Sequence, residues 1–151
     1  MGHATEVAER FYARFAEGDM DVAFADFAPN CVARTPSGLL DNEAHKAAAR
    51  SLKAAMPDGH MELVRVRGWG DEVYVTGWFR GTHVNDFRTP LGVVPASGNA
   101  LAMYFTDYVR VVAGRIVECE AVWDRLGMVA QLGAAVAADI GHMPALLAAA
   151  R

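Results

Sequence analysis

The chain has 151 residues, carries a net charge of −4, and is 53% hydrophobic and 21% charged. These values are typical of one folded globular domain, residues 1–151, and exclude an intrinsically disordered chain. Its Lys and Arg residues form no basic run, and no stretch approaches about 18 apolar residues, which argues against nucleic-acid binding and a membrane span. The N-terminal residues do not resemble a secretory signal, so a cytoplasmic location is expected.

A first helix is predicted from the N-terminal apolar spacing, with Thr5 as its cap and Gly18 at its end. Its apolar positions are Val7, Phe11 and Phe15, with Ala8 and Tyr12 beside them. A second short helix is expected from Asp21 to Phe27, ended by Pro29 and followed by a strand over 31–35. A third helix is predicted over 41–56, and it should end at the turn 57–59. His45 should lie on its exposed face.

From residue 60 onward the apolar period changes from 3.6 to 2. Four strand-like runs follow, over 60–70, 72–84, 99–112 and 115–124. Helices followed by an antiparallel meander indicate an α+β fold. We expect a cone-shaped curved antiparallel sheet, packed against the N-terminal helices and enclosing an apolar pocket. A last helix is predicted over 126–140, before an Ala-rich tail.

Side-chain parity along the strands identifies the candidate chemistry. Asp107 is the one acid in an otherwise apolar row formed by the odd positions of 99–112. It is either a pocket group with a raised pKa or a structural acid held by a donor. His83 ends an apolar row just before a long loop, where a cavity mouth would lie, and its side chain suits proton transfer. We take Asp107 and His83 as the candidate catalytic residues.

The candidate substrate-binding residues lie on the inward rows and on the first helix. Tyr12 could offer its phenol to a ligand or be a structural tyrosine at the core edge. The full set is Tyr12, Phe15, Phe79, Met103, Phe105, Cys119, Ala121 and Trp123. The two cysteines, Cys31 and Cys119, stand far apart without ligand-spaced partners, so both are expected to be small buried hydrophobes. No metal site and no cofactor are predicted.

The opposite face of the last two strands should meet solvent or a partner subunit. Glu118 and Glu120 point that way, and with Trp78, Tyr104 and Tyr108 they suggest a homodimer formed through the sheet. Asp124 is expected to cap the last helix rather than to act in catalysis. The loop 86–98 is either a lid over the cavity mouth or an ordinary connection.

The run GRIVECEAVWDRLGMVAQLG, residues 114–133, resembles the close of the SnoaL-like polyketide cyclases. The order of helices and strands, the RGTH run over 80–83 and the acid at Asp107 are also similar to that family. The resemblance implies the nuclear transport factor 2-like cone, shared with ketosteroid isomerase and limonene epoxide hydrolase. It further implies a cofactor-independent enzyme, commonly dimeric, that closes rings on polyketide intermediates in natural-product, including antibiotic, biosynthesis.

Aldol cyclases of that family use a buried aspartate on the final strand as general acid and base. The matching positions here are Cys119, Glu120 and Ala121, so the resemblance implies that this acid is replaced by Ala121. Three functions follow as alternatives. The first is a cyclase of the isomerase or lyase type that folds a hydrophobic polyketide in its cavity, by a pericyclic closure or with limited help from Asp107. The others are an epoxide-opening tailoring enzyme and a non-catalytic binder of hydrophobic ligands.

Overall fold

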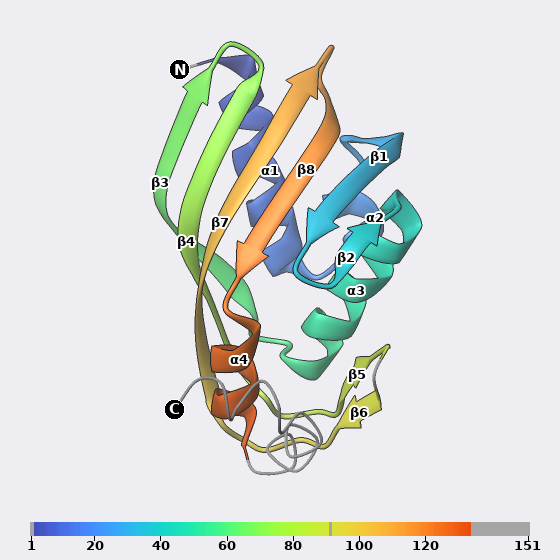
Figure 1. Cartoon of the computed structure of the whole chain (residues 1–151). Coiled ribbons are helices and arrows are strands. Elements are labelled where there is room, and N and C mark those ends of the chain that lie inside the picture. Colours follow the sequence, from blue (N-terminus) through green and yellow to red (C-terminus); the bar gives the residue numbers. More distant parts are fainter. Residues whose placement is uncertain (1, 91, 134–151) are drawn as a thin grey trace, which may run out of the picture.

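The computed structural model describes residues 2–90 and 92–133. Three of the helices lie before residue 56 and the longest strands follow them, as the sequence predicts (Figure 1). In chain order the elements are α1 (His3–Glu17), α2 (Met20–Ala23), β1 (Phe27–Thr35), β2 (Gly38–Leu40), α3 (Asn42–Ala55), β3 (His60–Trp69), β4 (Glu72–Thr82), β5 (Phe87–Thr89), β6 (Gly92–Val94), β7 (Ala100–Val112), β8 (Arg115–Trp123) and α4 (Arg125–Leu132).

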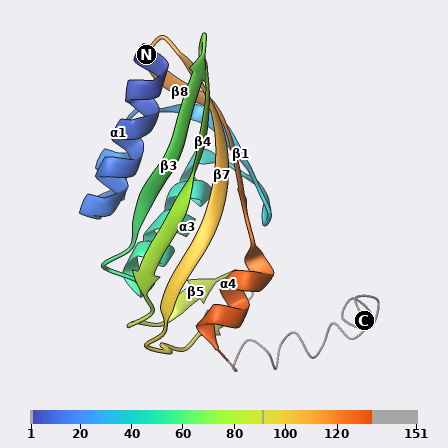
Figure 2. The same ribbon diagram turned by 90° about the vertical axis from the view of Figure 1, so that its left-hand side faces the viewer.

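Six strands form one curved sheet in the order β2-β1-β8-β7-β4-β3, and β5 pairs with β6 in a separate hairpin. The four long strands β3, β4, β7 and β8 make the predicted antiparallel meander. Strand β1 pairs with β8 in parallel and with β2 antiparallel, which extends the sheet beyond the meander. Helix α1 lies along one side of the sheet and α4 at its lower end (Figure 2).

Helix α1 begins earlier than the sequence predicts, so Thr5 as its cap is wrong. Gly2 occupies the N-cap position, and the Thr5 hydroxyl donates to the Gly2 carbonyl at 2.6 Å within the first turn. Thr5 is buried, and its methyl group lies where a side chain on Gly68 of β3 would sit. At the other end Gly18 adopts the left-handed conformation, and its N–H donates to the Phe15 carbonyl.

The second helix is shorter than predicted. Asp19 caps it, and it ends at Ala23, so Pro29 does not terminate it. Pro29 instead lies inside β1, where the pairing with β8 shifts register between Phe27 and Val32. A proline is tolerated there because an irregular stretch of ladder does not require its missing N–H.

Helix α3 confirms the prediction over 41–56 and is capped by Asp41, whose carboxylate accepts the Ala44 N–H at 2.8 Å. The predicted exposed position of His45 is wrong. Its ring packs edge-on against Phe24 and Phe27, with centroids 5.0 and 5.7 Å away. Burial lowers the pKa of His45 to about 4, because the protonated ring would lose its hydration there.

The predicted cap of the last helix is confirmed. The Asp124 carboxylate accepts the Gly127 N–H at 2.8 Å, and α4 follows over 125–132. The remainder of the helix predicted over 126–140, and the Ala-rich tail, lie outside the described residues. Within the part of the chain that the structure describes, no helix is long and apolar enough to cross a membrane.

Helix α4 is attached to β7 through the Gln131 side chain. Strand β8 ends opposite Phe105, which leaves the first residues of β7 without a partner strand on that side. The Gln131 amide bonds both backbone groups of Ala102, accepting its N–H at 2.8 Å and donating to its carbonyl at 3.0 Å. The side chain thereby replaces a strand's backbone and satisfies polar groups at the end of the sheet.

The outer face of the sheet carries aromatic side chains, as the parity predicts. Tyr74 packs against Tyr108 and Trp78 against Tyr104, with ring centroids 5.2 and 5.1 Å apart. Glu118 is exposed on this face and pairs with Arg110 at 3.0 Å. The homodimer through this face stays a prediction.

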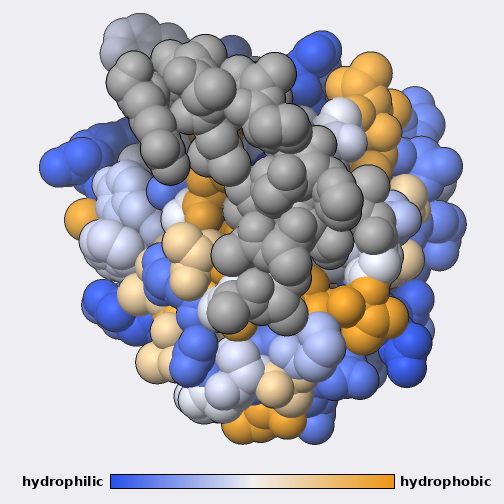
Figure 3. All heavy atoms as spheres, turned by 60° about the horizontal axis from the view of Figure 1, so that its bottom comes forward, coloured by the Kyte–Doolittle hydropathy of each residue, from blue (hydrophilic) through white to orange (hydrophobic). Residues whose placement is uncertain are grey.

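The segment 86–98, predicted as either a lid or a connection, contains the β5–β6 hairpin. The Asp86 carboxylate accepts the Ala96 N–H at 3.0 Å and closes the base of this hairpin. Seen from this end of the molecule, hydrophobic residues reach the surface between hydrophilic ones (Figure 3). The role of the segment 86–98 as a lid stays a prediction.

The two-residue turn between β7 and β8 holds a local strain. Ala113 and Gly114 both have positive φ, 49° and 75°, and Ala113 is the one such non-glycine residue in the described chain. A turn with positive φ at both central positions matches the right-handed twist of a hairpin and favours Asn-Gly. An alanine held there costs about 1–2 kcal/mol, because its Cβ approaches the backbone.

We therefore predict that Ala113→Asn stabilises the protein by about 0.5–1 kcal/mol, because asparagine tolerates the left-handed conformation. Urea denaturation followed by far-UV circular dichroism measures the difference. Ala113→Val is the matched control and should destabilise. Equal midpoints for all three proteins would show that the turn is not strained.

Candidate active site on the concave face

The site is built around Asp107, on the middle strands of the sheet. In the strand register Asp107 lies opposite Val75 on β4 and opposite Ala121 on β8. Residues directly opposite each other share a face, with Cβ atoms about 4.5–5.5 Å apart. Val75 is fully buried on the face that α1 covers, which confirms the predicted inward direction of Asp107. The residue itself is half-buried.

Tyr12 reaches Asp107 from helix α1. Its hydroxyl donates to the Asp107 Oδ2 at 2.6 Å, across 95 positions of sequence. The Tyr12 ring is buried and stacks on Phe105, with centroids 5.9 Å apart and an interplanar angle of 27°. Phe105 lies flat because Gly77, its partner on β4, has no side chain: a Cβ there would meet the Phe105 ring at 3.0 Å. Gly77 therefore helps to aim the phenol at the carboxylate.

Burial sets the ionisation of this pair. Desolvation raises the pKa of Asp107 to about 7, and the hydrogen bond from Tyr12 offsets part of that rise. The pKa of Tyr12 is raised well above its usual range, chiefly by burial and also by the nearby Asp107 charge. Tyr12 therefore stays a donor, while Asp107 exchanges its proton near neutral pH. A carboxyl group with this pKa can act as either an acid or a base.

The walls around this pair are apolar. Cys119 and Trp123 lie on the same strand as Ala121, Cys119 being buried and Trp123 half-buried. Burial and the neighbouring Asp107 raise the pKa of the Cys119 thiol well above its usual range, so it remains a protonated thiol rather than a nucleophile. Further along the concave face Phe79 pairs with Met103 across the strands, and the Phe15 ring packs edge-on against Phe79 at 6.3 Å.

His83 lies well away from Asp107. It follows the end of β4, eight positions beyond Val75, which corresponds to roughly 26 Å along a strand at about 3.3 Å per residue. It is not at an open cavity mouth, because the structure buries it completely, and its ring bonds Ser97. The two candidate catalytic residues therefore belong to different ends of the concave face.

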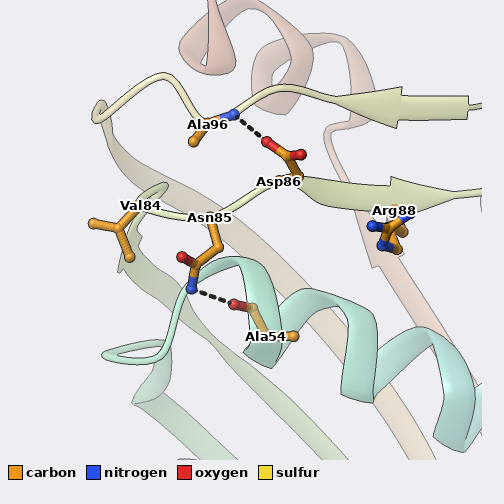
Figure 4. A pocket seen from close by; sticks show the side chains of 6 residues that line it. All are labelled: Ala54, Val84, Asn85, Asp86, Arg88 and Ala96. Atoms are coloured by element: carbon orange, nitrogen blue, oxygen red, sulfur yellow. Dashed lines mark hydrogen bonds between the residues drawn. The ribbon is translucent and has the colours of Figure 1, made fainter.

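A surface depression lies outside this face, between α3 and the β5–β6 hairpin. It has a volume of about 500 Å³, opens broadly to solvent, and is lined by Ala54, Val84, Asn85, Asp86, Arg88 and Ala96 (Figure 4). None of the predicted site residues lines it. Across residues 2–90 and 92–133, no three His, Cys, Asp or Glu side chains gather where they could hold a metal ion.

Sequence reasoning placed the inward acid and its apolar neighbours but missed two positioning residues. Gly77 lies inside a strand, where a glycine often marks a close approach of another group, and this signal could have identified it. Ser97, which orients His83, lies in a loop whose path local patterns do not predict.

A curved, mainly antiparallel sheet with N-terminal helices against its concave face is the nuclear transport factor 2-like fold, and here this face carries the half-buried Asp107 among apolar side chains. The sequence profile of the SnoaL-like polyketide cyclase family matches residues 6–132, and the chain belongs to that family. No curated protein matches the sequence significantly.

Solved structures agree with this assignment. IdmH, a candidate polyketide cyclase from Streptomyces antibioticus, is 27% identical, with a TM-score of 0.73, over 87% of this chain and 99% of its own. TsrD from Streptomyces laurentii is 25% identical, with a TM-score of 0.72, over 87% and 95%. AclR, a candidate hydroxylase from Streptomyces galilaeus, shares only the fold at 18% identity, with a TM-score of 0.77, over 86% and 95%.

The raised pKa of Asp107 predicts a pH-dependent effect of its replacement on stability. Between pH 3.8 and about pH 7 the folded protein keeps a proton on Asp107 that the unfolded chain has released. The contribution of Asp107 to the free energy of unfolding is therefore lost as the pH rises through this window. Asp107→Asn has no such proton. The free energy of unfolding of Asp107→Asn, taken relative to that of wild type, should be on the order of 2 kcal/mol higher at pH 8 than at pH 4.5.

Urea denaturation at both pH values measures this difference, with Glu120→Gln on the exposed face of β8 as control. If the free energies of unfolding of wild type and Asp107→Asn change by the same amount between the two pH values, the pKa of Asp107 is not raised.

Proposed function

We propose that this protein closes rings on hydrophobic polyketide intermediates, with Asp107 as the group that moves the proton. The observation that carries the proposal is the position of Asp107, directly across from Ala121. In the family that the chain belongs to, the strand of Ala121 is where the aldol cyclases are expected to carry their acid. The Asp107 carboxyl group thus lies on β7, next to β8, and on the same face of the sheet as Ala121.

The proton steps balance without any cofactor. The ionised Asp107 removes a proton from the carbon beside a substrate ketone, and the carbon of the resulting enolate attacks a second carbonyl group of the same molecule. A carbon–carbon bond forms, and the new alkoxide takes the proton back from Asp107. A pKa of about 7 suits both transfers near neutral pH.

Tyr12 and the apolar walls support these steps. The Tyr12 phenol holds one oxygen of Asp107, which leaves the other oxygen for the substrate. The aromatic and thioether side chains along the concave face provide the surface on which a flexible chain would fold, and orientation lowers the barrier to ring closure. An isomerase or lyase type of reaction follows from this scheme.

The alternatives make different demands on the site. Epoxide opening by related cone-fold enzymes uses a cluster of carboxylates, whereas Asp107 is the one acid on the inward rows of β4, β7 and β8. A non-catalytic binder has no need of a carboxyl group with a raised pKa. Closure by folding alone would not depend on Asp107.

Heptane-2,6-dione is a simple test substrate, because its intramolecular aldol condensation gives 3-methylcyclohex-2-enone and water, and the enone absorbs in the ultraviolet. Asp107→Asn should lower the protein-dependent rate by about 100-fold or more, the usual contribution of a general base. The wild-type rate should rise with pH through about 7, because the ionised carboxylate is the active form.

Glu120→Gln should retain the wild-type rate. A rate that survives Asp107→Asn would assign catalysis to substrate folding, and the absence of turnover by every variant would favour the binding protein.

A further inference from the structure

The His83 ring is fixed by the loop that follows the β5–β6 hairpin. Its Nδ1 lies 2.9 Å from the Ser97 hydroxyl oxygen and accepts the Ser97 backbone N–H at 3.2 Å. The same hydroxyl oxygen accepts the Asn99 N–H at 3.2 Å, which leaves its own hydrogen free to point at the ring. The His83 backbone also exchanges bonds with Gly98 and Asn99, at 2.8 and 2.9 Å.

These contacts determine which ring nitrogen of the neutral imidazole carries the hydrogen. A nitrogen that faces the Ser97 N–H and hydroxyl donors has to be the acceptor, so the hydrogen lies on Nε2. Nε2 is buried and has no hydrogen-bond partner in the described part of the chain. His83 is therefore a fully buried side chain with one donor left unused, an arrangement that costs free energy unless an acceptor arrives.

Apolar side chains lie beside Gly81, the residue before His83 on the same inward row. Gly81 pairs with the buried Leu101 and packs against Met56. Within hydrocarbon surroundings, a single oriented N–H distinguishes a ligand that carries an oxygen from one that does not. Met56, whose side chain lies beside Gly81, carries a flexible thioether.

We propose that the Nε2–H of His83 is a specificity-determining hydrogen-bond donor for a carbonyl or hydroxyl oxygen of the substrate. This inference rests on the proposed function, because it requires the concave face to be the substrate site. Along the strand direction, His83 and Asp107 are separated by roughly 26 Å. A substrate that contacts both residues must span this distance. It is an elongated, largely apolar chain with an oxygen function far from the carbons that Asp107 activates.

Butyrophenone and butylbenzene test the donor without turnover, because they differ only in a carbonyl group against a methylene group. Wild type should bind the ketone about tenfold more tightly in a fluorescence or calorimetric titration. In ¹H–¹⁵N spectra tuned to imidazole, His83 should show the Nε2–H tautomer at neutral pH. Its Nε2–H signal should shift with butyrophenone and not with butylbenzene.

His83→Phe removes the donor and should abolish the tenfold preference, whereas His83→Gln, which keeps an N–H, should retain part of it. Asp107→Asn should keep the full preference, so loss of turnover in that variant and loss of the preference in His83→Phe are separable. A hydrogen on Nδ1 in the wild-type spectrum, or equal affinity of wild type for the two probes, would overturn the proposal even if a variant fails to fold.

Discussion

The hydrogen bond between Tyr12 and Asp107 is the interaction on which the site depends. A carboxylate on an apolar face needs compensation, and among the described residues the hydrogen bond to it comes from a neutral phenol rather than a cation. An arginine or lysine in that place would hold the carboxylate ionised and its pKa low. The phenol orients the group and lets its pKa rise to about 7, so one contact between α1 and β7 serves both packing and proton exchange.

The shape of the sheet makes this contact possible. Gly77 leaves room for Phe105 to lie flat, Phe105 supports the Tyr12 ring, and the phenol then meets the carboxylate. On the next strand Ala121 adds only a methyl group beside Asp107. We interpret the site as one in which the proton-carrying group occupies β7 instead of β8. On either strand, the carboxyl group faces the concave side of the sheet.

Strand parity was enough to predict the inward direction of Asp107, because alternation along a regular strand is a local property. The caps at Asp41 and Asp124 are equally local, since each binds an N–H three positions ahead. The pairing of Tyr12 with Asp107 spans 95 positions and depends on how α1 crosses the sheet, which no local pattern fixes.

The errors have the same origin. Thr5 appeared free to cap a helix, but burial against β3 places it inside the first turn. The charged neighbours Lys46 and Arg50 favour a solvent-facing position for His45. The rings of Phe24 and Phe27, brought close by the packing of α3 on β1, cover part of it instead. In each case a tertiary contact overrode a local preference.

We infer that the concave face, rather than one particular strand, determines where the acid works. The ring-closing rate of the exchanged double variant Asp107→Ala with Ala121→Asp, compared with that of Asp107→Ala alone, tests this. We expect the single variant to be inactive and the exchanged carboxyl group to restore at least a tenth of the wild-type rate. Full activity in Asp107→Ala alone, or a folded exchange variant with no activity, would contradict it.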